Sequence, residues 1–216
     1  MARSQDDYLW KLAHAERAAL AEDLAGLEPA QWRHDTLCGD WDVEEVVAHL
    51  TAAASLNQAQ WVRSMLAARL RPDVHNQRRL AEHRGSTPAE TLDQFRTIIS
   101  STAAPSRHTP AYLGEIVAHA QDIRRPLGLA ATPSLDALTP VANFFARRNF
   151  TVRSRTHAAD LKLRADDGPF AWGTGPLVSG STLALVMGMA GRVAYLAELA
   201  GPGVQTLRSR LQAAAG

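Results

Sequence analysis

The stretch DWDVEEVVAHL (residues 40–50) contains a pattern typical of a helix N-terminus. It is followed by apolar residues whose spacing places them on one face of a helix. Asp42 is followed three residues later by Glu45, the pattern of an acidic capping box at a helix N-terminus. The buried face of this helix is expected to contain its apolar residues Val43, Val46, Val47 and Leu50. We expect the helix to run to about Leu70, before Pro72.

Helical periodicity extends to both sides of this stretch. Apolar residues recur at spacings of three and four from Tyr8 to Leu27, and further helices are expected to open at Pro88 and Pro110. The polar segment 71–88 is expected to be a surface loop. Four helices before residue 127 are typical of a helical bundle.

The pattern changes after residue 130. A helix is predicted over residues 135–147, and residues 157–180 alternate apolar and polar side chains around turn residues, as a β-hairpin does. Two more helices are expected, over residues 181–199 and 204–211. The sequence therefore predicts a mainly α chain, with a four-helix bundle in residues 1–130 and a small α+β region in residues 131–216.

The composition excludes several classes of protein. Hydrophobic residues make up 46% and charged residues 21%, as in soluble globular proteins, and the net charge of +1 provides no field that would attract nucleic acid or an anionic membrane. The single cysteine, Cys38, cannot form an internal disulfide, which favours a reducing compartment. The N-terminus lacks a signal-peptide pattern and no apolar stretch is long enough to span a membrane. We expect a cytoplasmic protein, with no membrane or nucleic-acid partner and an oligomeric state that the sequence leaves open.

Three side chains are candidates to bind one metal ion. Glu115 and His119 lie four residues apart in the predicted helix GEIVAHAQDIRRPLG (residues 114–128), so both project from one face. His49 borders the buried face of the second helix, where an imidazole needs a partner. If these helices face each other, two imidazoles and one carboxylate form a set that suits a catalytic zinc, because one coordination position stays open. Asp122 is a third group of the same stripe, or an acceptor that orients a ligand.

Each of these residues also has a simpler interpretation. A Glu-x-x-x-His pair is often a solvated pair on a helix surface, and His49 alone would be a hydrogen-bonded histidine at the edge of a core. Asp122 precedes two arginines, with which a surface ion pair is an alternative. For Cys38 we prefer a packing role over that of an extra ligand or a redox thiol.

Two stretches together resemble the signatures of the mycothiol-dependent maleylpyruvate isomerase family, a branch of the DinB-like metal-binding four-helix bundles. Residues 29–50, PAQWRHDTLCGDWDVEEVVAHL, resemble the first signature, and residues 114–128 resemble the second. The stretch LVSGSTLALVMGMAGRVAYLAEL (residues 177–199) is similar to the sterol-carrier-like C-terminal region of that family. The resemblance implies a DinB-like bundle in residues 1–130 and a sterol-carrier-like domain in residues 131–216.

The resemblance also implies a chemistry. The family holds a divalent ion, usually zinc, through three residues that correspond here to His49, Glu115 and His119. Its members use the thiol mycothiol, which implies a low-molecular-weight thiol and a small-molecule electrophile as partners. An isomerase of this kind adds the thiolate to a conjugated cis double bond, lets the new single bond rotate and eliminates the thiol, whereas an S-transferase forms only the adduct. Arg192 is the candidate catalytic residue that would bind a substrate carboxylate or a developing enolate, and Arg124 and Arg125 are weaker candidates.

Two other functions stay open on the same bundle. One is a metal-dependent hydrolase, which would be active without a thiol, and the other is a non-catalytic metal-binding or sensor protein. We expect a full isomerase of the family to be longer than this chain, and the substrate itself is left open.

Overall fold

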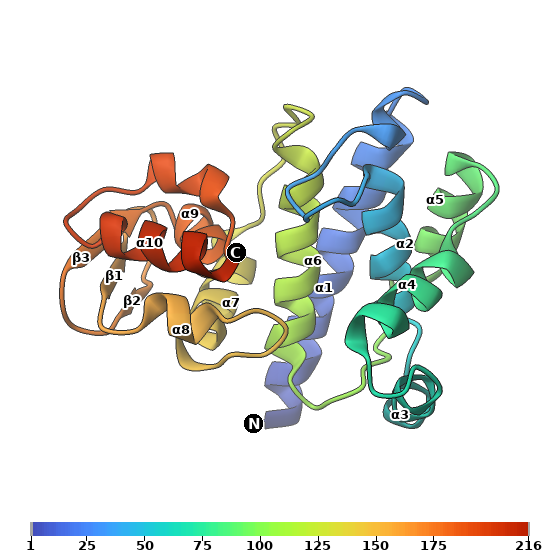
Figure 1. Ribbon diagram of the computed structural model, residues 1–216, viewed down its shortest axis with the longest axis horizontal. Coiled ribbons are helices and arrows are strands. Elements are labelled where there is room, and N and C mark those ends of the chain that lie inside the picture. The colour runs from blue at the N-terminus through green and yellow to red at the C-terminus, as the bar shows by residue number, and fades with distance from the viewer. Residues whose placement is uncertain (1, 216) are drawn as a thin grey trace. The chain divides into compact units, whose positions relative to one another are not determined.

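The structure, a computed structural model, describes residues 2–215 and divides into two compact units, Met1–Thr132 and Pro133–Gly216 (Figure 1). Its architecture confirms the predicted fold class, a mainly α chain with a helical bundle followed by a small α+β region. None of the helices in the described part of the chain is long and apolar enough to cross a membrane.

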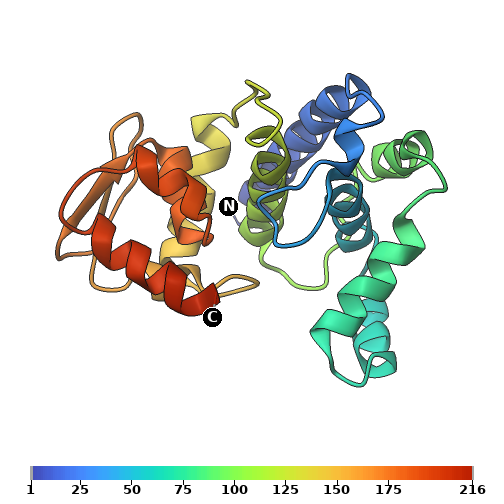
Figure 2. The same ribbon diagram turned by 45° about the horizontal axis from the view of Figure 1, so that its top comes forward.

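The N-terminal unit is built from helices. They are α1 (Ala2–Ala25), the short 3-10 helix η1 (Gln31–Arg33), α2 (Val43–Ala53), α3 (Gln58–Ala67), α4 (Pro72–His83), α5 (Pro88–Thr97) and α6 (Thr109–Arg124). Helices α1 and α6 run side by side, and α2 packs against α4, α5 and α6 (Figure 1). The α3–α4 pair forms one end of this unit (Figure 2). The packed faces of α2 and α6 position the candidate site.

The start of α2 has the predicted geometry. The Glu45 backbone N–H donates to Asp42 Oδ1 at 2.8 Å, and the Asp42 N–H donates to Glu45 Oε2 at 3.0 Å, so the capping box is complete. The apolar residues predicted to face the core, Val43, Val46, Val47 and Leu50, are all buried. Capping and burial together fix where α2 begins and which face it presents to α6.

The prediction that the second helix runs to about Leu70 is wrong, because α2 ends at Ala53 and α3 begins after Asn57. Asn57 forms a second capping box with Gln60, with both hydrogen bonds at 3.0 Å, and these bonds start a new helix in a different direction. The prediction of a surface loop over residues 71–88 is also wrong for most of that segment, because the segment contains α4. A narrow buried face with Leu80 is enough to hold this polar helix in place.

A buried ion pair joins α1 to α6. Arg124 is 1% exposed, and its Nε donates to Asp23 Oδ2 at 2.7 Å. Its Nη1 lies 3.9 Å from Glu16 Oε2. These contacts give Arg124 a place in the packing of the two helices, which favours a structural role over substrate binding.

The C-terminal unit surrounds a small sheet. It contains α7 (Leu135–Arg147), α8 (Ser154–Ala158), β1 (Lys162–Ala165), β2 (Ala171–Trp172), β3 (Leu177–Gly180), α9 (Thr182–Met189), the 3-10 helix η2 (Val193–Glu198) and α10 (Val204–Ala215). The strand order is β2-β1-β3, with β1 antiparallel to β2 and parallel to β3. The predicted hairpin is therefore present as β1 and β2. The prediction of a single helix over residues 181–199 is wrong. Gly191, with a φ of 94°, interrupts the helical backbone and separates α9 from η2.

Candidate metal centre

The structure brings His49 of α2 together with Glu115 and His119 of α6. One potential ligand atom from each of these residues lies within 4.8 Å of the other two. His49 Nε2 is 3.4 Å from Glu115 Oε1, and the two imidazole rings meet edge to face with their centroids 5.1 Å apart. Two imidazoles and a carboxylate at this separation form a donor set that a divalent cation such as zinc can bind.

The ring of Trp41 fixes one side of this cluster. Its centroid lies 4.8 Å from that of His49, and the two planes are inclined by 44°. The Trp41 carbonyl accepts hydrogen bonds from the backbone N–H and the hydroxyl of Thr36, which hold the loop before α2. Trp41 therefore restricts the imidazole of His49 to orientations that face α6.

Asp122 acts on His119 from the other side. His119 Nδ1 lies 3.0 Å from Asp122 Oδ2, and the carboxylate is fully buried. If Nδ1 donates this hydrogen bond, Nε2 is the nitrogen that remains for a metal, as in many histidine ligands whose second nitrogen is held by a carboxylate. The burial of Asp122 excludes the alternative of a surface ion pair.

Charge interactions within the cluster shift the pKa of two candidate ligands. Burial alone would lower the pKa of His119, but hydrogen bonds with Asp122 and with the Cys38 thiol outweigh it and raise the pKa to about 10. Burial alone would raise the pKa of Glu115, but its hydrogen bond with His49 and the charges of the neighbouring cations lower it below the usual value. Glu115 is therefore held in the ionised form that binds cations.

One of those cations, Arg17 of α1, was not among the residues predicted from the sequence. It is buried, and its Nη1 donates to the carbonyl oxygens of Ile98 at 3.0 Å and Ser101 at 2.7 Å. Burial lowers the pKa of its guanidinium, and Glu115 acts in the opposite direction. The sequence contained a signal for Arg17. It lies four residues after Ala13 and three before Leu20, both buried, so its charge falls within an apolar stripe of the helix.

A second possible ligand set overlaps the first. Cys38, His119 and Asp122 also have potential ligand atoms within 4.8 Å of one another. The Cys38 backbone N–H donates to Thr36 Oγ1 at 3.1 Å, and the Leu37 N–H donates to the carbonyl oxygen of Asp122 at 3.1 Å. This loop is thus fixed to α6, and the thiol lies beside the cluster. Because both sets use His119, they are alternative ligand sets for one ion.

Arg192, the candidate catalytic residue, lies in the C-terminal unit between α9 and η2. It is half-buried, and its Nη1 donates to the carbonyl oxygen of Ala190 at 2.8 Å. The three candidate metal ligands all belong to the N-terminal unit. The catalytic assignment of Arg192 therefore stays a prediction.

Comparison with known proteins confirms the resemblance found in the sequence. Residues 13–112 match the model of a family described as the mycothiol maleylpyruvate isomerase N-terminal domain. This match includes His49 and ends before Glu115, so two of the three candidate ligands, Glu115 and His119, lie outside it.

Two solved structures have a similar fold over nearly the whole chain. They are crystal structures of the mycothiol-dependent maleylpyruvate isomerase and of a mutant of it. Each is 16% identical in sequence, has a TM-score of 0.63, and is matched over 91% of this chain and 92% of the other chain. No curated protein matches the sequence. At this identity the likeness establishes the shared fold. Because the match covers nearly all of both chains, the expectation that this chain is shorter than the isomerase is wrong.

Proposed function

We infer that the N-terminal unit is a mycothiol maleylpyruvate isomerase N-terminal domain, and from this premise we propose that the chain is a metal-dependent enzyme that uses mycothiol. It is an isomerase or an S-transferase, and its substrate is a small electrophile of the maleylpyruvate type. The observation that carries the proposal is the convergence of His49, Glu115 and His119 within a fold of this family. The preferred metal is zinc.

The residues present fit such an ion. Three protein ligands leave one position of a tetrahedral shell for a further ligand. A bound zinc would supply a Lewis acid that holds a thiol in its thiolate form near neutral pH. The carboxylate of Asp122 orients His119, and the buried charge of Arg17 favours the ionised form of Glu115.

Arg192, in the C-terminal unit, is the catalytic residue of the proposal. Its guanidinium binds a substrate carboxylate or the enolate that develops when a thiolate adds to a conjugated double bond. The hydrogen bond to the Ala190 carbonyl supports the proposal, because it holds one nitrogen of the guanidinium in a fixed position.

A cytoplasmic location without a nucleic-acid partner is part of the proposal. It is supported by the balanced net charge of +1 and by the single free cysteine.

The first test measures the metal content of the purified chain by elemental mass spectrometry. We expect about one divalent metal ion per chain, and a large loss in each of His49→Ala, Glu115→Ala and His119→Ala. His34→Ala is the matched control, because His34 is exposed and its Nδ1 hydrogen-bonds to the neighbouring Asp35 carbonyl oxygen. Full occupancy in all three ligand variants would overturn the site.

The second test titrates mycothiol into the metal-loaded chain by calorimetry. We expect binding accompanied by proton release, because a thiol that binds as thiolate loses its proton. Metal without thiol binding would overturn the thiol-dependent activity. Turnover of ester or amide substrates without thiol would then identify a hydrolase, and its absence would identify a non-catalytic metal-binding protein.

A further inference from the structure

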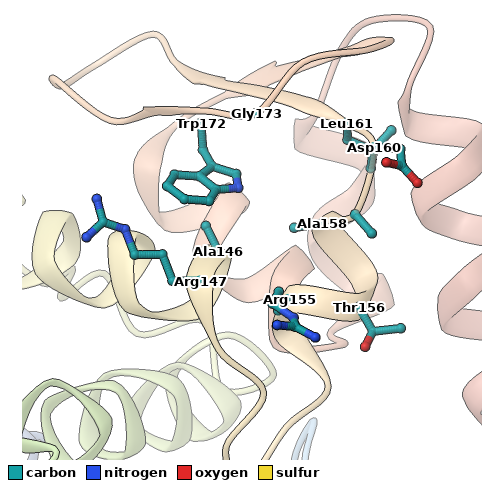
Figure 3. Close-up of a pocket in the computed structure, with 10 residues that line it drawn as sticks. Ala146, Arg147, Arg155, Thr156, Ala158, Asp160, Leu161, Trp172 and Gly173 are labelled. Carbon is teal, nitrogen blue, oxygen red and sulfur yellow. The ribbon is translucent and has the colours of Figure 1, made fainter.

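A cavity in the C-terminal unit is separate from the candidate metal ligands in sequence and in chemistry. Its volume is about 510 Å³, within the range of small-molecule sites, and it is lined by residues of α7, α8, the turn after α8 and the end of β2. Figure 3 shows the indole of Trp172 above Ala146, with Arg147 beside it and Arg155 on the opposite wall. None of the residues used in the proposed reaction lines this cavity.

The cavity carries an excess of positive charge. Arg147 and Arg155 line it, and within residues 2–215 neither guanidinium forms an ion pair with a carboxylate. The only acidic side chain of the lining is Asp160, which has no ion-pair partner in the same described range. The segment 147–155 adds two further arginines and no acidic residue. The cavity is therefore suited to a ligand with a negative charge.

The same cavity offers a flat aromatic surface and an apolar floor. The Arg147 Cζ lies 5.2 Å from the centroid of the Trp172 ring, so this guanidinium is stacked on the indole and held in the wall. Ala146, Ala158 and Leu161 are buried and form the floor. These surfaces are suited to a planar apolar group that carries an anion.

The walls of the cavity are fixed by short-range packing. A Cβ at Gly173 would collide with the carbonyl oxygen of Leu161, so the chain after β2 lies directly against the turn that follows α8. From the other side, Arg210 of α10 donates to the carbonyl oxygens of His157 and Ala159. A cavity with such supports binds a ligand without a large cost of ordering its own backbone.

We propose that this cavity is a binding site for a planar organic carboxylate, such as an aromatic or conjugated acid. The carboxylate binds between Arg147 and Arg155, and the ring lies on Trp172 and the alanine floor. The site operates without the metal centre, so its existence does not depend on the proposed enzyme activity.

The test uses 4-fluorobenzoate as the probe and follows its binding to the full chain by fluorine NMR. The chain is first freed of metal with a chelator, so that a carboxylate cannot bind at the candidate metal centre. We expect saturable broadening with 4-fluorobenzoate and at least about tenfold weaker binding of the neutral 4-fluorobenzamide. Equal binding of the acid and the amide would overturn the proposal.

Variants locate the binding. Arg147→Gln and Arg155→Gln are each expected to weaken 4-fluorobenzoate about tenfold, since each removes a charged hydrogen-bond donor. The matched control is Arg164→Gln, an exposed arginine of β1 that pairs with Asp166 at 3.7 Å and lies outside the cavity. Unchanged binding in both cavity variants, or equal loss in the control, would overturn the location.

A final comparison tests the aromatic part of the ligand class. Trp172→Leu is expected to weaken the probe about fivefold, whereas Trp172→Phe keeps an aromatic surface and most of the affinity. Inorganic phosphate is expected to compete poorly, because it has no planar group. Full displacement by equimolar phosphate together with no effect of Trp172→Leu would indicate a general anion site and overturn the proposed ligand class.

Discussion

His119 Nδ1 lies 3.0 Å from Oδ2 of Asp122, a fully buried carboxylate one turn further along α6. The contact joins a candidate metal ligand to a carboxylate that orients its ring.

Asp122→Asn tests the orienting role. The amide keeps the shape of the side chain but removes its charge, so metal affinity is expected to fall about 10–100-fold. Competition against a chromophoric chelator measures the change, with the exposed Asp93→Asn as the control. Unchanged affinity would contradict the orienting role, and a loss as large as that of His119→Ala would make Asp122 a ligand.

Cys38→Ser distinguishes the two overlapping ligand sets. With cobalt in place of the native metal, a coordinated cysteine gives an intense near-ultraviolet sulfur-to-metal band. We expect no such band in the unmodified chain without added mycothiol, and we expect nearly unchanged cobalt content in Cys38→Ser. A strong band that this substitution abolishes would show that the set of Cys38, His119 and Asp122 holds the ion instead.

Arg192→Gln tests the proposed substrate contact. Metal content is expected to stay at the level of the unmodified chain, because this residue is outside the ligand cluster. Thiol-dependent turnover is expected to fall about 100-fold or more, as with the loss of a donor to a developing anion. Steady-state kinetics and metal analysis on the same preparation check both statements, and unchanged kinetics would remove Arg192 from the site.

Arg124→Ala tests the buried ion pair between α1 and α6. Removal of the guanidinium leaves Asp23 without its 2.7 Å partner, and the free energy of unfolding is expected to fall by about 3 kcal/mol. Arg96→Ala breaks an exposed pair with Asp93 and is expected to cost about 0.5 kcal/mol. Urea unfolding compares the two, and equal losses would contradict the assigned importance of burial.

His75 is expected to make the stability of the α3–α4 pair depend on pH. Burial, followed by the positive charge of Arg79, lowers the pKa of His75, and its Nδ1 lies 2.9 Å from Ser64 Oγ. Because the folded-state pKa lies below the unfolded value of about 6.5, the unfolded state binds the proton more readily. The contribution to stability is therefore complete above that value and is lost as the pH falls through the lower folded-state pKa.

Hydrogen exchange of α3 and α4 between pH 7.5 and pH 5 measures this dependence. After correction for the slower intrinsic amide exchange at the lower pH, we expect smaller protection factors in these helices at pH 5, and a smaller difference between the two pH values in His75→Gln. The same pH dependence in that variant would assign the effect to other groups.

Local signals in the sequence were enough to predict several elements. The capping box of Asp42 and Glu45 marks the start of α2, and the proline and periodicity after Thr87 mark α5. The end of α2 was missed because apolar spacing continues past Ala53, while the new start at Asn57 depends on side-chain hydrogen bonds in a polar stretch. Helix α4 was missed because its stability comes mainly from tertiary packing of a narrow face.

The candidate site was predictable where spacing determines the geometry. Glu115 and His119 share a face because they are four residues apart on one helix. Whether His49 approaches Glu115 and His119 depends on how two helices pack together. The predicted burial of the residues around His49 was the evidence for that packing. The burial of Asp122 and the approach of Arg17 depend on which side of α6 meets α1, and spacing along one helix carries no such information.

The candidate ligands His49, Glu115 and His119, together with the orienting Asp122, come from only two helices of one unit. Substitutions in the other unit therefore change none of these candidate ligands. In the proposed enzyme, selection on substrate choice can act on residues 133–216 while the metal site is inherited unchanged. Such a division would allow one metal-binding bundle to serve enzymes with different substrates.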